Sequence, residues 1–160
     1  MTTRGVSGTE TLAVRVDGEP VELQVTPSTS LLRALRDAGH TATTGACEQG
    51  ECGSCSVLLD GHLVCSCLVP AAVCESAEIT TVRSLVRADL AEAFARHGAV
   101  QCGFCTPGFI VAAEAALAAP DPIDESTVRE ALAGNLCRCT GYQGIVEAVV
   151  EVSRSRRGRR

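Results

Sequence analysis

Residues 101–108 of the chain read Gln-Cys-Gly-Phe-Cys-Thr-Pro-Gly, and residues 135–141 read Asn-Leu-Cys-Arg-Cys-Thr-Gly. The first segment holds a C-x2-C pair of cysteines and the second a C-x-C pair, and a threonine and a helix-like run follow each pair. Threonine is a good helix N-cap, and Pro107 stands where the first turn of a helix tolerates proline. We therefore expect the four sulfurs at the N-termini of two helices, where the helix dipole favours an anionic, sulfur-ligated group. The four residues are Cys102, Cys105, Cys137 and Cys139.

A second group of cysteines comes earlier, where residues 47–55 read Cys-Glu-Gln-Gly-Glu-Cys-Gly-Ser-Cys. This C-x4-C-x2-C spacing, with a fourth cysteine farther on, is typical of plant-type [2Fe–2S] ferredoxins. Gly50 and Gly53 would let the backbone turn and approach inorganic sulfide. Structural zinc prefers cysteine pairs placed symmetrically, so the spacing favours iron–sulfur. Cys65 and Cys67 share one face of a predicted strand, and spacing alone leaves either as the fourth ligand.

The pairs in segments 101–108 and 135–141 do not form a ferredoxin loop. Four thiolates fit one more [2Fe–2S] cluster, whose negative charge the two helix ends would stabilise. A zinc site with four cysteine ligands is the alternative, since a C-x-C pair does not exclude it. Cys74 matches neither spacing, and we expect the two cysteines left over to be small buried hydrophobes.

The order of predicted elements indicates an α+β fold with two domains. Strand-like alternation occurs at residues 10–16, 21–25, 56–59, 62–67 and 78–82. Helical periodicity occurs at residues 31–39, 88–97, 107–118, 126–133 and 144–152. We expect a flexible leader (1–9), a sheet domain with one helix (10–82), a four-helix domain (85–152) and a solvated basic tail (153–160). The helical domain is small enough for a metal cluster to act as a staple.

The composition and charge of the chain argue against several classes of protein. The formal net charge of −5 argues against a general nucleic-acid binder. No apolar run is long enough for a membrane span, and the N-terminus shows no secretory signal. We therefore expect a cytoplasmic protein, in which the ten cysteines are metal ligands rather than a disulfide framework. Five of the fourteen arginines fall between Arg154 and Arg160; a short interaction arm is the alternative to a solvated end.

Taken together, the motifs C-E-Q-G-E-C-G-S-C, S-C-L, Q-C-G-F-C-T-P-G and C-R-C-T-G-Y resemble the iron–sulfur subunit of the molybdenum hydroxylases. This family includes xanthine dehydrogenase, aldehyde oxidoreductase and carbon monoxide dehydrogenase. The resemblance runs from about Leu12 to Val150. It implies a β-grasp ferredoxin-like domain followed by a four-helix [2Fe–2S] domain. It also implies two ligand sets, Cys47, Cys52, Cys55 and Cys67 for the first cluster and Cys102, Cys105, Cys137 and Cys139 for the second.

The resemblance further implies the partners of the chain. The second cluster would lie next to the molybdopterin of a large subunit, with Gln101 and Cys139 contacting the pterin. The first cluster would face the FAD of a medium subunit, in an assembly such as a dimer of heterotrimers. We predict an electron-transfer subunit with substrate chemistry on a partner chain, most similar to xanthine dehydrogenase through residues 66–70. The alternatives are an aldehyde or carbon monoxide dehydrogenase subunit, and a zinc-stabilised binding module.

Overall fold

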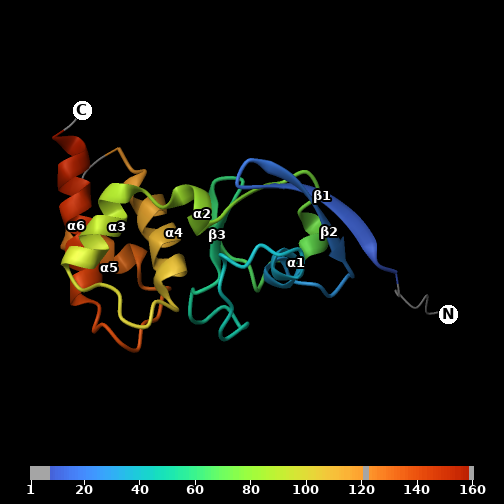
Figure 1. Ribbon diagram of the computed structural model, residues 1–160, viewed down its shortest axis with the longest axis horizontal. Helices are drawn as coiled ribbons and strands as arrows, with labels where there is room; N and C mark the ends of the chain where they lie inside the picture. Colours follow the sequence, from blue (N-terminus) through green and yellow to red (C-terminus); the bar gives the residue numbers. More distant parts are fainter. Residues whose placement is uncertain (1–7, 121–122, 159–160) are drawn as a thin grey trace.

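The computed structural model describes residues 8–120 and 123–158, and it has the predicted α+β architecture. A sheet with one helix forms one end of an elongated molecule, and a group of helices forms the other end (Figure 1). Residues 1–7 of the predicted leader lie outside the described part of the chain, and Gly8 and Thr9 are exposed. The two ends therefore correspond to the two kinds of element that the periodicity predicted.

The sheet has five strands in the order β2-β1-β5-β3-β4. Their bounds are β1 Glu10–Val16, β2 Glu19–Val25, β3 Ser56–Leu59, β4 His62–Cys65 and β5 Glu78–Thr80. The strands β1 and β2, and likewise β3 and β4, form antiparallel hairpins. Their turns are Asp17-Gly18 and Asp60-Gly61, which are typical two-residue hairpin connections. The strand β5 joins the hairpins by pairing parallel to β1 and antiparallel to β3.

The helix α1 (Leu31–Asp37) packs on the sheet and completes its core. Ser30 is its N-cap and accepts a hydrogen bond from the backbone N–H of Arg33 at 3.3 Å. Leu31 and Leu35 are fully buried against the alternating inward residues of β1 and β2. This apolar layer fixes the scaffold from which the first cysteine loop, residues 47–55, extends.

The second half of the chain is helical. Its elements, all after β5, are α2 Val82–Leu85, α3 Ala88–Arg96, α4 Thr106–Leu117, α5 Glu125–Ala131 and α6 Gln143–Arg157, whereas a 3-10 turn, η1 Ala71–Val73, lies earlier between β4 and β5. The helix α4 is apolar on nearly every side because it contacts the other helices and also β3 and β4 (Figure 1). It therefore joins the helical core to the sheet, and it brings the residues before it close to the first cysteine loop.

Of the predicted solvated tail at residues 153–160, the structure describes residues 153–158, most of which are exposed but belong to a helix or its end. The helix α6 continues past the predicted end at Val152 as far as Arg157. Ser153 is buried, and its hydroxyl accepts a hydrogen bond from the backbone N–H of Ile123 at 3.1 Å. Basic side chains favour the C-terminal end of a helix, and Arg156 reaches carboxylates on α3 and α4. Residues 159–160 lie outside the described part of the chain.

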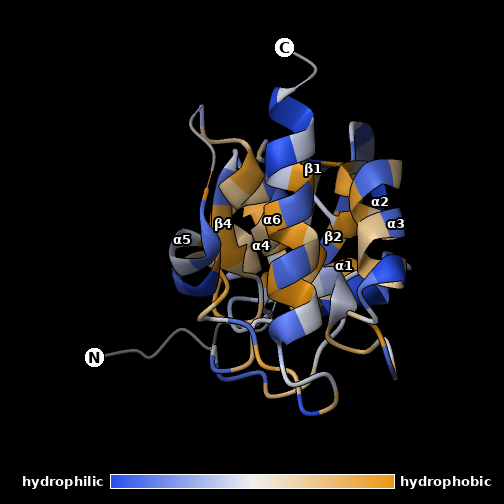
Figure 2. Cartoon of the chain, turned by 90° about the vertical axis from the view of Figure 1, so that its left-hand side faces the viewer, coloured by the Kyte–Doolittle hydropathy of each residue, from blue (hydrophilic) through white to orange (hydrophobic). Residues whose placement is uncertain are grey.

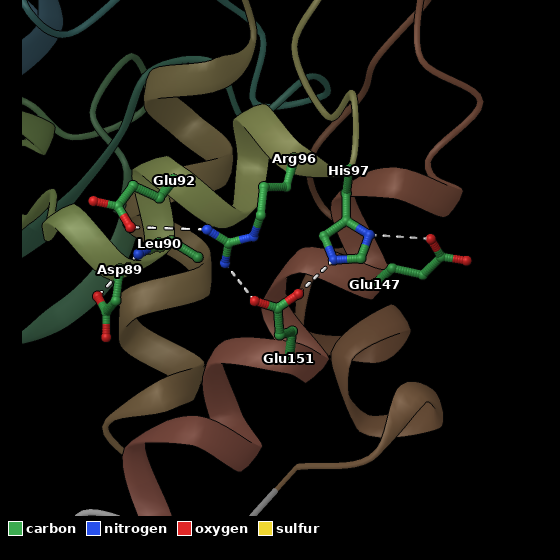
Figure 3. Close-up of polar contacts among 7 residues, drawn as sticks. All are labelled: Asp89, Leu90, Glu92, Arg96, His97, Glu147 and Glu151. Atoms are coloured by element: carbon green, nitrogen blue, oxygen red, sulfur yellow. Dashed lines mark hydrogen bonds and ion pairs between the residues drawn. The ribbon is translucent and has the colours of Figure 1, made fainter.

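Polar contacts also join α3 to α6 on the outer side of the helical unit. His97, directly after α3, contacts Glu151 at 2.7 Å and Glu147 at 3.3 Å, and Arg96 contacts Glu151 as well (Figure 3). Seen from the helical end of the molecule, α6 lies in front of the other elements and carries both hydrophobic and hydrophilic residues (Figure 2). None of the helices in the described residues is both long and apolar enough to cross a membrane.

Candidate metal centres

The first cysteine loop lies between α1 and β3 and turns sharply at Gly50 and Gly53, which have φ angles of +78° and +65°. These are the two glycines predicted to let the backbone turn. The backbone N–H of Gln49 points at the sulfur of Cys47 at 3.4 Å. This contact, followed by the thiol of Cys52, lowers the pKa of Cys47 to about 7. The loop thus favours a thiolate, which is the form that binds a metal.

The remaining thiols of this site come from the two ends of the β3–β4 hairpin. Cys55 is buried directly before β3, and Cys67 follows β4 by two residues. Burial, and then contact with the thiol of Cys55, raises the pKa of Cys67 to about 12. The structure therefore brings all four predicted residues of the first set together. Cys47 lies near Cys52, and Cys67 lies near Cys55, as Cys65 also does.

Cys65 and Cys74 have different surroundings, although both were predicted as buried hydrophobes. Cys74 is 1% exposed within the sheet core, as expected of a small apolar residue. Cys65 is only partly buried, and it lies at the end of β4 beside the cysteine site. Burial, and then the neighbouring Cys55, raises its pKa. Cys65 is therefore a fifth thiol at this site, contrary to the prediction for it.

The second group of cysteines forms two pairs at different depths. The sulfurs of Cys102 and Cys139 lie 3.7 Å apart at the surface, where both residues are exposed. Cys105 and Cys137 form the inner, partly buried pair. Burial, and then the thiol of Cys137, raises the pKa of Cys105 to about 12. The segments 101–108 and 135–141 are thus brought together as the sequence predicted.

The pKa of Cys137 moves in the opposite direction. Burial opposes the shift, but hydrogen bonds led by the hydroxyl and backbone N–H of Thr140 lower this pKa to about 7. The Thr140 hydroxyl lies 3.1 Å from the Cys137 sulfur, and the backbone N–H of Cys137 donates to the Tyr142 hydroxyl at 2.9 Å. The ring of Tyr142 meets Phe109 edge to face, with centroids 6.1 Å apart. Thr140 and Tyr142 together therefore hold Cys137 in place.

The helix caps differ from those predicted. Cys105, not Thr106, is the N-cap of α4, and Thr106 is the first helical residue. The helix α6 starts only at Gln143, with Tyr142 as its N-cap. Cys137 and Cys139 therefore lie in the loop before α6 rather than at its N-terminus. In that loop the Thr140 hydroxyl donates to the Cys137 sulfur and accepts the backbone N–H of Tyr142 at 3.3 Å.

The two cysteine sites lie back to back. The backbone N–H of Leu136 donates to the carbonyl oxygen of Cys52 at 3.0 Å, and the side-chain amide of Asn135 donates to the carbonyl oxygen of Gly53 at 3.0 Å. The Thr44 hydroxyl forms a second link, at 3.1 Å from the carbonyl oxygen of Phe104. No pattern in the sequence predicted a role for Asn135 or Thr44. Their partners lie far away in the sequence, so no local spacing could have revealed them.

The pairing of thiols at the second site bears on the kind of metal centre it suits. A structural zinc ion takes four ligands at ~2.3 Å around one point. A [2Fe–2S] cluster has two irons, and each of them takes two protein ligands. The outer pair Cys102 and Cys139 and the inner pair Cys105 and Cys137 fit this second requirement.

Comparison with protein families gives two adjacent matches. Residues 14–84 match the family described as "2Fe-2S iron-sulfur cluster binding domain", and residues 73–150 match "[2Fe-2S] binding domain". Each match contains one of the two cysteine groups. The families therefore divide the chain in the same way as the sheet and the helices do.

Curated relatives match nearly the whole chain. The xanthine dehydrogenase iron–sulfur-binding subunit of Escherichia coli O157:H7 is 43% identical, over 94% of this chain and 98% of the relative. The nicotine 6-hydroxylase small subunit of Paenarthrobacter nicotinovorans is 46% identical, over 94% of each. Both are subunits of larger enzymes by their names, and their substrates differ.

Solved structures have the same fold. A chain of quinoline 2-oxidoreductase from Pseudomonas putida 86 superposes with a TM-score of 0.85 at 39% identity, covering 96% of this chain and 98% of that one. Aldehyde oxidoreductase from Desulfovibrio desulfuricans gives a TM-score of 0.87 at 37% identity, covering 93% of this chain but 17% of that longer chain. The same two-part fold thus occurs both as a separate chain and as a segment of a larger one.

Proposed function

This chain belongs to the iron–sulfur small subunits of the molybdenum hydroxylase family, and we propose that it carries electrons from the molybdopterin of a large subunit to the FAD of a medium subunit. The observation that carries the proposal is the back-to-back placement of two paired-thiol sites, joined by the hydrogen bond from Leu136 to Cys52. A binding module has no need of two such sites in contact, whereas electron transfer in series requires it.

We assign the eight paired cysteines as ligands. The first cluster would be held by Cys47, Cys52, Cys55 and Cys67, and the second by Cys102, Cys105, Cys137 and Cys139. Bound clusters of this kind supply one-electron transfer. The Gln49 backbone N–H and the Thr140 hydroxyl already point at ligand sulfurs, where hydrogen bonds set the reduction potential.

The surface around the second site supports docking of the molybdopterin subunit there. The outer pair Cys102 and Cys139 is exposed, and Gln101 beside it is exposed too. Phe104 and Leu136, next to the ligands, are 50% and 52% exposed, which is unusual for large apolar side chains near a metal site. In this proposal Gln101 and Cys139 contact the pterin, and electrons enter the chain at this edge.

The first cysteine loop would face the FAD subunit, so electrons leave the chain there. Leu68, directly after Cys67, is 60% exposed at this end and would lie in that interface. We propose that the assembly is a dimer of heterotrimers, which the mass of the purified complex tests. A mass that fits one copy of each subunit would contradict it.

For the holoenzyme we propose a purine-type substrate, as for xanthine dehydrogenase, on the basis of residues 66–70, Ser-Cys-Leu-Val-Pro. The 43% identity to the xanthine dehydrogenase subunit of Escherichia coli O157:H7 supports this proposal, whereas the 46% identical nicotine 6-hydroxylase subunit is named for a different substrate. Assaying the purified complex with xanthine, aldehydes and carbon monoxide tests the substrate class. Turnover of aldehydes or carbon monoxide without xanthine would overturn it.

Metal analysis of the purified chain tests the electron-transfer function itself. Two clusters require about four irons and four acid-labile sulfides per chain, with two EPR signals on reduction. Stoichiometric zinc in a colourless, EPR-silent protein would instead establish the binding module. The Cys139→Ala variant tests the assignment of the second site: it should lose one EPR signal and keep the ferredoxin-type signal. Loss of both signals, or of neither, would contradict the assignment.

The Gln101→Ala variant tests the entry point. Gln101 is exposed and is not a ligand in our assignment, so both EPR signals should remain. Reduction of the clusters by substrate in the assembled complex should become slower. A rate equal to that of the unmodified complex would show that Gln101 has no coupling role.

A further inference from the structure

The contact between the two cysteine sites contains a continuous bonded route from one ligand to another. Cys52, of the first site, offers its backbone carbonyl oxygen, which accepts the N–H of Leu136 at 3.0 Å. Leu136 is joined by its peptide bond to Cys137, of the second site. The route from the Cys52 sulfur to the Cys137 sulfur therefore runs through covalent bonds and crosses one hydrogen bond. Electrons tunnel through such a route more readily than across an open gap.

A backbone hydrogen bond between two loops persists only where both loops are held. On the first loop, the carbonyl oxygen of Gly53 accepts the hydroxyl of Ser56 at 2.7 Å and the side-chain amide of Asn135 at 3.0 Å. On the second loop, the backbone N–H of Asn135 donates to the carbonyl oxygen of Leu132 at 2.9 Å, at the end of α5. Asn135 is 4% exposed, and its side chain forms a hydrogen bond across both loops directly beside the route.

The fit around Asn135 leaves little freedom. A Cβ on Gly53 would lie 2.5 Å from the side-chain nitrogen of Asn135 and 2.4 Å from the carbonyl oxygen of Gly134. The two loops therefore approach as closely as their backbones allow, and the Asn135 amide fills the remaining space with a hydrogen bond. Removal of this amide lets the loops separate along the direction of the Cys52–Leu136 bond.

We propose that Asn135 is a positioning residue that sets the electronic coupling between the two cysteine sites, by holding the Cys52–Leu136 hydrogen bond closed. The inference rests on the proposed function, because coupling has meaning only if both sites carry clusters. Asn135 touches no predicted ligand sulfur in this role. It acts through the peptide that joins the two ligand loops.

Thr44 provides a matched control. Its hydroxyl also links the two loops, at 3.0 Å from the Ser54 carbonyl oxygen and 3.1 Å from the Phe104 carbonyl oxygen. This link lies outside the Cys52–Leu136 route. The Thr44→Val variant keeps the side-chain shape and removes the hydroxyl, so it weakens the same interface without touching the route. If Asn135 only held the two loops together, Thr44→Val would have the same effect as the Asn135 variants.

The test uses the assembled complex with Asn135→Ala, Asn135→Asp and Thr44→Val. Asn135→Asp keeps the size of the side chain but places a carboxylate against a carbonyl oxygen, which repels it. Iron content should stay at about four per chain in all three. In both Asn135 variants the magnetic splitting between the two reduced clusters should shrink, and electrons should reach the first cluster several-fold more slowly. Thr44→Val should match the unmodified complex in both measurements.

Three results would overturn the proposal: unchanged splitting and rate in the Asn135 variants, an equal loss in Thr44→Val, or iron loss in every Asn135 variant. If Asn135→Ala and Asn135→Asp both lose iron, Asn135→Ser is added as the smallest polar replacement. Iron loss in all three makes Asn135 a residue of cluster retention rather than of coupling. Absence of iron from the unmodified chain would instead contradict the proposed function, so the two failures are distinguishable.

Discussion

Gly108, in the first turn of α4, lies directly against the backbone of Gly53 in the first cysteine loop. A Cβ built on Gly108 would stand 2.2 Å from the Gly53 carbonyl oxygen. This oxygen already accepts hydrogen bonds from Ser56 and Asn135, so it has no room to move. The helix that carries the second site thus packs backbone to backbone on the loop that carries the first.

The Gly108→Ala variant should consequently separate the two units. Overpacking commonly costs about 1–3 kcal/mol, and here the neighbour is backbone rather than a flexible side chain, so we expect about 3 kcal/mol. Thermal unfolding and iron content of the purified chain measure the effect. Gly134→Ala is the control, because nothing lies within 4 Å of a Cβ at that position. Equal stability of the two variants would show that the close approach is not needed.

A buried ion pair should dominate the stability of the helical unit. Arg156 of α6 contacts Glu114 of α4 at 2.7 Å and Asp89 of α3 at 2.8 Å. The side chains of Arg156 and Glu114 are 18% and 8% exposed. The Arg156→Met variant leaves the Glu114 carboxylate buried without this guanidinium. Removing one partner of a buried pair commonly lowers the free energy of unfolding by about 3–5 kcal/mol. Because Arg156 is still partly exposed, we expect the lower end of this range, about 3 kcal/mol.

Denaturant unfolding compares Arg156→Met with Arg154→Met, which removes an exposed arginine from the same helix. The Arg154 variant should change the free energy of unfolding by less than about 0.5 kcal/mol, as surface substitutions usually do. If the free energy of unfolding falls by the same small amount in both variants, the ion pair is not needed and the apolar face of α6 alone holds the helix in place.

The carboxylate pair at His97 should make a small, pH-dependent contribution to stability. Contacts with His97, and then with Arg96, lower the pKa of Glu151 below its usual value of 4.5 (Figure 3). A lowered folded-state pKa stabilises the fold above the unfolded-state pKa, and this stabilisation is lost as the pH falls through the folded-state value. Carboxyl NMR titration should therefore find Glu151 below 4.5, and His97→Ala should raise it. A pKa of Glu151 that is unchanged in His97→Ala would exclude the histidine as a cause.

Local signals in the sequence predicted the elements well. The hairpins at Asp17-Gly18 and Asp60-Gly61 are present because two-residue turns specify their own geometry. The strand β1 has the predicted bounds because each alternate residue faces the core. Both cysteine groups assemble from spacing that the metal chemistry dictates. In each case the information lies within a few residues.

Contacts between distant segments were not predictable in this way. The parallel pairing of β5 with β1 joins strands some sixty residues apart in the sequence. The extension of α6 likewise depends on distant residues, because Arg156 meets Asp89 and Glu114. The same holds for Asn135, whose amide meets Gly53 across the two units. Periodicity describes only which face of an element is apolar. It does not show which polar side chain will form a buried hydrogen bond or ion pair.

The identity of the fourth ligand at the first site is the remaining choice that spacing left open. Burial, and then the neighbouring Cys55, raises the pKa of both Cys65 and Cys67, and at Cys67 the backbone of Gly50 in the first cysteine loop opposes this rise. We therefore predict that Cys67→Ser loses or strongly alters the ferredoxin-type EPR signal, and that Cys65→Ser keeps it. The second-site signal serves as the internal control in both variants, since its ligands lie in the other unit. The reverse pattern, with the signal lost in Cys65→Ser alone, would assign Cys65 as the ligand.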